Sequence, residues 1–65
     1  MGILSEVIVL RLSDKETFLG NSWTREDGSL EAFWYEKGGM RVTKYFDAKG
    51  IQTGAWKEYK LHFRN

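Results

Sequence analysis

Residues 33–46 read FWYEKGGMRVTKYF, and this stretch decides the fold class. Gly38 and Gly39 reach positive φ at little steric cost, which suits the two-residue loop of a β-hairpin. The aromatic and β-branched residues on both sides of the pair favour extended strands. Neither a helix nor a Lys-Ser or Lys-Thr dipeptide follows the glycines, so a phosphate-binding loop is not indicated. The stretch therefore predicts an antiparallel hairpin.

Turn signals of the same kind recur on both sides of this hairpin. They lie at residues 13–16, 27–28, 37–39, 47–50 and 53–54, and the first four are about 10 to 13 residues apart, as in an up-and-down sheet or small barrel. Residues 13–16 (SDKE) have the form of a helix capping box, but the residues after them support at most one helical turn. The predicted strands are residues 3–12, 17–25, 29–36, 40–46 and 55–64.

The chain contains no Pro and no linker-like segment, so residues 1–65 are expected to form one domain. The predicted fold is all-β: a small antiparallel five-stranded meander, built as a strongly twisted sheet or a small open barrel. Residues 3–12 are apolar on both faces, which favours a central strand. The last segment alternates, with Tyr59, Leu61 and Phe63 inward and Lys60, His62 and Arg64 outward.

Aromatic side chains are expected to dominate the core. A chain of 65 residues buries only about 60% of its unfolded surface, and this one has three Trp, three Tyr and four Phe. The rings expected to point inward are Trp34, Phe46, Tyr59 and Phe63. The rings left to be exposed are Tyr35, Tyr45 or Trp56. Exposure of several rings would create a large apolar patch, so a homodimer is expected.

Composition also bears on the compartment. The chain has no Cys, which excludes disulfides and thiolate metal sites and fits a reducing cytoplasm. The first residues, MGILSE, lack the basic start and cleavage site of a signal peptide. The longest apolar run, VIVL at residues 7–10, is far short of the about 20 residues that a membrane span needs. We therefore expect a cytoplasmic protein without membrane partners.

Charge is divided unevenly along the chain. The net charge is +1, but residues 1–36 carry −4 and residues 37–65 carry +5. Such a split indicates either a basic face for an anionic partner or complementary strands within one sheet. Glu6 falls in an otherwise apolar row, so it either marks the frayed start of a strand or pairs with a basic residue of a neighbouring strand.

No residue set has the types and spacing of a known catalytic or metal site. His62 is the single histidine, and with no Cys present a transition-metal site would need carboxylates around one imidazole. Ser22 or Ser29 could be combined with His62 and Asp47 as a triad, but no nucleophile-elbow motif holds either serine. We expect neither an enzyme nor a bound cofactor or metal.

Two functions remain, both based on binding. The first is a non-enzymatic interaction module, a regulator or inhibitor among other forms, that binds a protein through a face or edge of its sheet. The alternative is single-stranded nucleic-acid binding, which needs exposed rings beside a basic groove. For both functions the candidate partner-binding residues are Arg41, Lys44, Tyr45, Trp56, Lys60, His62 and Arg64.

Overall fold

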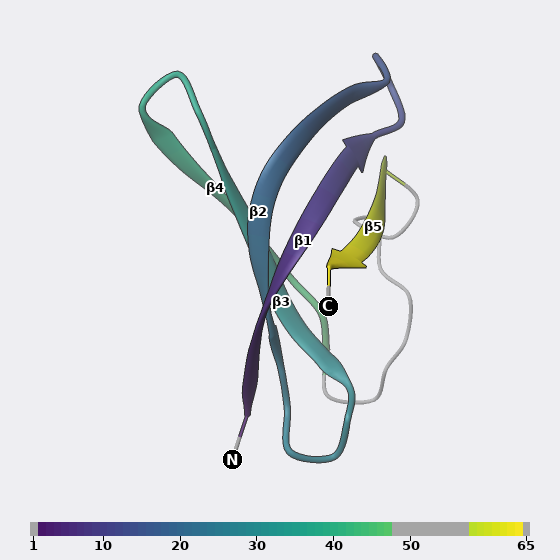
Figure 1. Ribbon diagram of the computed structural model, residues 1–65, viewed down its shortest axis with the longest axis vertical. Coiled ribbons are helices and arrows are strands. Elements are labelled where there is room, and N and C mark those ends of the chain that lie inside the picture. Colours follow the sequence, from purple (N-terminus) through teal and green to yellow (C-terminus); the bar gives the residue numbers. More distant parts are fainter. Residues whose placement is uncertain (1, 48–57, 65) are drawn as a thin grey trace.

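A computed structural model describes residues 2–47 and 58–64 of the chain. They form one antiparallel five-stranded sheet, which confirms the predicted all-β class (Figure 1). The strands are β1 (Ile3–Arg11), β2 (Glu16–Thr24), β3 (Leu30–Lys37), β4 (Met40–Tyr45) and β5 (Tyr59–Arg64). Their order in the sheet is β4-β3-β2-β1-β5.

The first four strands follow one another as a meander. The hairpin at the glycine pair is confirmed, because Lys37 pairs with Met40 and both glycines have positive φ, 60° at Gly38 and 78° at Gly39. The turn between β1 and β2 covers residues 12–15, and the Lys15 N–H donates to the Arg11 carbonyl at 2.8 Å, so the structure has no more than the one turn expected there. The predicted turns at 48–50 and 53–54, and the predicted strand residues 55–57, lie outside the described residues.

The last strand returns to the beginning of the sheet. β5 pairs with β1 and not with β4, with Glu6 opposite Arg64 and Arg11 opposite Tyr59. β1 therefore has a neighbour on each side, β2 and β5, as its apolar residues on both faces predict. The two edges of the sheet are β4 and β5.

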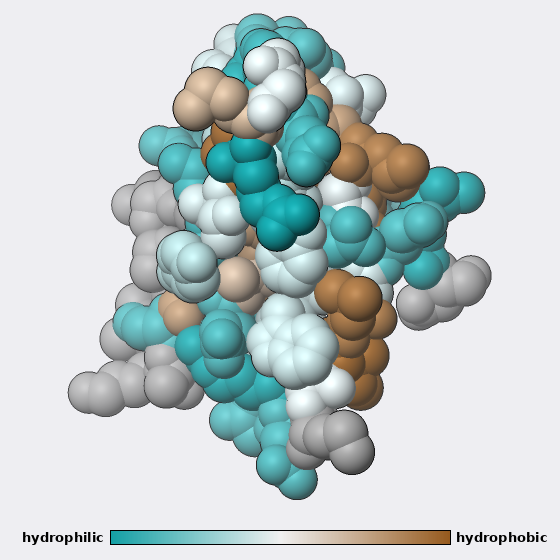
Figure 2. All heavy atoms as spheres, turned by 90° about the vertical axis from the view of Figure 1, so that its left-hand side faces the viewer, coloured by the Kyte–Doolittle hydropathy of each residue, from teal (hydrophilic) through white to brown (hydrophobic). Residues whose placement is uncertain are grey.

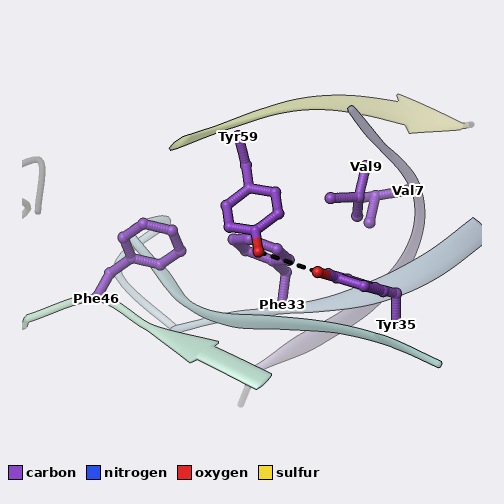
Figure 3. Close-up of a cluster of buried hydrophobic side chains, with 6 residues drawn as sticks. All are labelled: Val7, Val9, Phe33, Tyr35, Phe46 and Tyr59. Atoms are coloured by element: carbon purple, nitrogen blue, oxygen red, sulfur yellow. Dashed lines mark hydrogen bonds between the residues drawn. The ribbon is translucent and has the colours of Figure 1, made fainter. Parts of the chain in front are cut away.

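The core lies on one face of the sheet, which curls around it; we call this the concave face (Figure 3). Curling brings β5 over β3, although β2 and β1 separate these strands in the sheet. The ring centroids of Phe33 and Tyr59 are 5.3 Å apart, and the hydroxyls of Tyr35 and Tyr59 are 3.0 Å apart. The buried hydrophobic cluster is Val7, Val9, Phe33, Tyr35, Phe46 and Tyr59.

Two predicted ring orientations are wrong. Trp34 points away from the core and is half-buried on the opposite face, whereas Tyr35 is buried and cannot serve as an exposed platform. Alternation requires this exchange, because Tyr35 shares the core face with Phe33 and the residue between them must point the other way. Phe46 and Tyr59 are buried as predicted, and Phe63 is on the core side but 44% exposed.

Two residues fix the curvature. Gly20 is buried where β2 faces β3, and a Cβ there would lie 2.2 Å from the Trp34 carbonyl oxygen, so the two backbones could not approach as they do. Arg25, after β2, donates to the carbonyls of Leu30 at 3.2 Å, Phe46 at 2.8 Å and Asp47 at 3.2 Å. These bonds tie the end of β4 to the β2–β3 connection.

Candidate interaction surface

The other side of the sheet, the convex face, carries the alternate residues of all five strands. Cross-strand register defines it: Trp23 pairs with Ala32 and Ala32 with Tyr45, while Asn21 pairs with Trp34 and Trp34 with Thr43. Its principal side chains are Leu4, Glu6, Ile8, Leu10, Leu19, Asn21, Trp23, Ala32, Trp34, Glu36, Arg41, Thr43, Tyr45, Lys60, His62 and Arg64.

An aromatic depression of about 370 Å³ lies over β2, β3 and β4. Trp23 and Tyr45 stand on either side of Ala32, whose small side chain leaves the space between them open. Trp34 closes one end, and Arg41 also lines the depression. Two strand spacings separate the flanking rings, about 10 Å, so a flat apolar group fits between them.

A second depression of about 270 Å³ lies on the other side of Trp34. Leu19, Asn21 and Glu36 line it, and it shares Trp34 and Arg41 with the first. The convex face thus has one indole between two hollows. The convex face therefore offers a partner both projecting side chains and recesses to contact.

Large apolar side chains on this face reach solvent. Leu4 is 59% exposed, Leu19 62% and Tyr45 70%. Ile8 and Leu10 are half-buried next to them. Figure 2 shows the result: brown aliphatic and pale aromatic side chains lie beside one another, with teal polar groups around and between them. No strand within residues 2–47 and 58–64 crosses over this face.

The structure separates the sequence-predicted partner-binding residues into groups. Arg41 and Tyr45, on edge strand β4, both line the aromatic depression. Lys60, His62 and Arg64 share the same face but lie on β5, at the opposite edge. Lys44 is on the concave side, where its Nζ lies 5.8 Å from the centroid of the Tyr59 ring. Trp56 lies outside the described residues.

Acidic residues lie between these cations. Glu6 pairs with Arg64 across β1 and β5 at 3.4 Å, which confirms the second alternative considered for Glu6. Glu36 is the cross-strand partner of Arg41, and Glu31 lines the aromatic depression. Among residues 2–47 and 58–64, opposite charges therefore lie on adjacent strands, as in the second interpretation of the charge split.

Sequence reasoning missed the three side chains that shape the depressions: Leu19, Trp23 and Trp34. The sequence shows that they alternate with Phe18, Ser22 and Tyr35. It does not show which of these two sets of residues faces the core. In β3, Phe33 and Tyr35 lie on the core face and Trp34 on the other, although all three residues are aromatic. Once β3 is oriented in this way, register places Trp23 and Leu19 on the same side as Trp34.

The other polar residues that the structure describes include one histidine and several carboxylates in turns. His62 is exposed, and the described residues contain no group of three or more His, Asp or Glu side chains placed to hold a metal ion. A hydrogen bond from Arg11 lowers the pKa of Asp14 to about 2, and hydrogen bonds from Ser29 lower the pKa of Asp27. Both carboxylates are held ionised in turns, the opposite of what a general acid requires.

Comparison with known proteins gives no relative: no family model, curated protein or solved structure matches the chain. Within the described residues, no helix has the length and apolar character needed to cross a membrane. The surface chemistry of the convex face is therefore the basis for assigning a function.

Proposed function

We propose that this protein is a non-enzymatic interaction module that binds a protein partner through the convex face of its sheet. The observation that carries the proposal is the apolar character of that face. Leu4, Leu19 and Tyr45 are each more than half exposed on the face that carries the aromatic depression, in a molecule whose own core is on the other face. Contiguous exposed apolar groups with a polar rim are typical of protein-binding surfaces.

Polar groups on the same face suit a protein ligand. Arg41, Glu36 and Asn21 stand beside the rings, so hydrogen bonds and ion pairs can orient a partner that the apolar groups hold. Aromatic and Arg side chains are also the types that contribute most to protein interfaces. A regulator or inhibitor that acts by covering a site on its target would use such a surface.

Single-stranded nucleic-acid binding is the second candidate. Tyr45, 70% exposed, lines the same depression as Arg41 and two Trp rings, and bases can stack on such rings. The charges favour the protein ligand. Lys60 and Arg64 are at the far edge, Lys44 is on the other face, and Glu31 and Glu36 lie beside the rings where a phosphate backbone would need cations.

Site-specific photo-crosslinking in the native cell tests the proposal. A photoreactive amino acid replaces Tyr45 on the convex face or, as a matched control, Met40. Met40 is equally exposed, at 72% against 70%, lies on the same strand and has the opposite side-chain parity. We expect protein adducts at position 45 that survive nuclease treatment, and few or none at position 40.

Two results would contradict the proposal. Equal adducts at positions 40 and 45 would show that the convex face is not the contact surface. Adducts at position 45 that disappear with nuclease, together with binding to single strands that weakens steeply as salt is added, would favour the nucleic-acid function instead.

A further inference from the structure

The distribution of exposed apolar side chains is strongly one-sided. The described residues include seven large hydrophobic side chains that are exposed. Four of them, Leu4, Leu19, Trp23 and Tyr45, are on the convex face. The other three, Ile3, Met40 and Phe63, have the opposite parity and lie on three different strands, each at or next to the strand's end. Among the described residues, the convex face thus gathers most of the exposed apolar side chains on which an occupant could pack.

The size of that face suits a second copy of the chain. Each partner in a standard-size interface contributes about 800 Å². The whole molecule has 4672 Å² of accessible surface, so such an interface takes about one-sixth of it. The convex face carries side chains of all five strands and is available for such a contact, while the concave face is occupied by the core.

The charges of the convex face are balanced. Three acidic and three basic residues lie on it or at its rim: Glu6, Glu31, Glu36, Arg41, Lys60 and Arg64. Two copies of this face therefore bring together no excess of like charge. Opposite charges at the rim can form ion pairs that fix the position of one copy relative to the other. A strongly charged partner of either sign gains no such advantage.

The shape of the face also suits contact with a copy of the same face. An interface with two-fold symmetry uses the same patch twice, so the patch must contain both the projection and the recess that receives it. Trp34 stands between two depressions, one of about 370 Å³ and one of about 270 Å³. Leu19 and Tyr45, 62% and 70% exposed, project beside these depressions, so the side chains of one copy and the hollows of the other supply the two halves of such a contact.

We propose that the partner on the convex face is a second copy of this chain, packed face to face as a two-layer β-sandwich. The two sheets then lie about 10 Å apart, as in other sandwiches, with Leu19, Trp23 and Trp34 between them. This inference rests on the proposed function, because it names the occupant of the same surface. It turns a sheet with one covered face into a sheet covered on both.

Sedimentation equilibrium of the purified full chain over a wide concentration range tests the inference. The variants are Leu19→Lys and Leu4→Lys on the convex face, with Met40→Lys as the control. All three side chains are more than half exposed in the single chain, so each variant should keep its fold, which circular dichroism verifies. We expect a dimer whose dissociation constant rises at least about tenfold with either leucine variant and is unchanged by Met40→Lys.

Two outcomes overturn the inference. One is a monomer at every concentration. The other is a dimer that neither leucine variant weakens, which would put the contact elsewhere, at the β4 or β5 edge for example. Both outcomes leave the proposed function separately testable. A monomer whose position 45 still crosslinks to another protein in cells contradicts only the dimer. Absence of protein adducts at position 45 contradicts the proposed function itself.

Discussion

The hydroxyl groups of Tyr35 and Tyr59 lie 3.0 Å apart in the core and join two strands, β3 and β5, that are not neighbours in the sheet. β2 and β1 separate these strands in the sheet, so the contact exists only because the sheet curls (Figure 3). Both rings are buried, and each hydroxyl is the other's hydrogen-bond partner. The pair therefore links β5 to β3 across the curl of the sheet.

Removal of one hydroxyl should cost more than removal of both. Tyr59→Phe takes from the buried Tyr35 hydroxyl its hydrogen-bond partner on β5, which costs about 1–3 kcal/mol, whereas the double variant Tyr35→Phe, Tyr59→Phe should be close to neutral. Urea unfolding of the two single variants and the double variant measures the coupling. Strictly additive effects of the two single changes would show that the hydroxyls do not interact.

The same pair makes stability fall in alkali. Burial, followed by the hydrogen bond to Tyr59, raises the pKa of Tyr35 above its ordinary value of 10.0. Below pH 10, Tyr35 is protonated in the folded and the unfolded state, and its contribution to the free energy of unfolding is fully present. As the pH rises from 10 through the pKa of the folded state, this contribution is lost, because the unfolded chain loses the Tyr35 proton first. Thermal unfolding from pH 8 to 11 should show this decline in stability. In the Tyr35→Phe variant the decline should be smaller, because the part due to Tyr35 is absent.

Gly20→Ala should destabilise the protein by at least about 2 kcal/mol, because an added Cβ lies 2.2 Å from the Trp34 carbonyl oxygen and the sheet must open to accept it. Gly38→Asn is the matched control. Gly38 has φ of 60°, which Asn tolerates, and a Cβ there meets no atom within 4 Å. Chemical denaturation compares the two, and equal midpoints would contradict the role assigned to Gly20.

Arg25→Lys should lower stability by about 1–3 kcal/mol although charge is kept. A lysine ammonium cannot reproduce the planar fork that reaches the carbonyls of Leu30 and Phe46 together. Arg41→Lys, on the exposed convex face, should change stability by less than about 0.5 kcal/mol. Thermal melts of both variants give the comparison; a silent Arg25→Lys would mean that the β4 end is held by other contacts.

Much of the strand pattern could be predicted from the sequence. Glycine-containing turns mark the hairpin loops near Gly28 and Gly38, and alternation places Tyr59 inside and Lys60 outside. These signals are local, since they depend on φ preferences and on the two-residue period of a strand. They identify the strands without identifying each strand's partner.

The convex site could not be predicted in the same way. Phe33, Trp34 and Tyr35 are all aromatic, so hydrophobicity alone does not distinguish the buried set from the exposed one. The separation of Arg41 from Lys60 to opposite edges depends on β5 pairing with β1, a contact between residues far apart in the chain. Turn chemistry does not encode that choice, so the sequence could propose Arg41 and Lys60 for one face, which they share, without showing that they lie at opposite edges.

The pairing of β5 with β1 also has a consequence for how the molecule is made. Glu6 and Arg64 are cross-strand partners although 58 positions separate them in the chain. Contacts over such a span carry a large loop-closure cost and form late in folding. Until β5 is in place, β1 is itself an open edge beside an uncovered Val7 and Val9, so a chain that ends before residue 59 should aggregate at concentrations where the 65-residue chain does not.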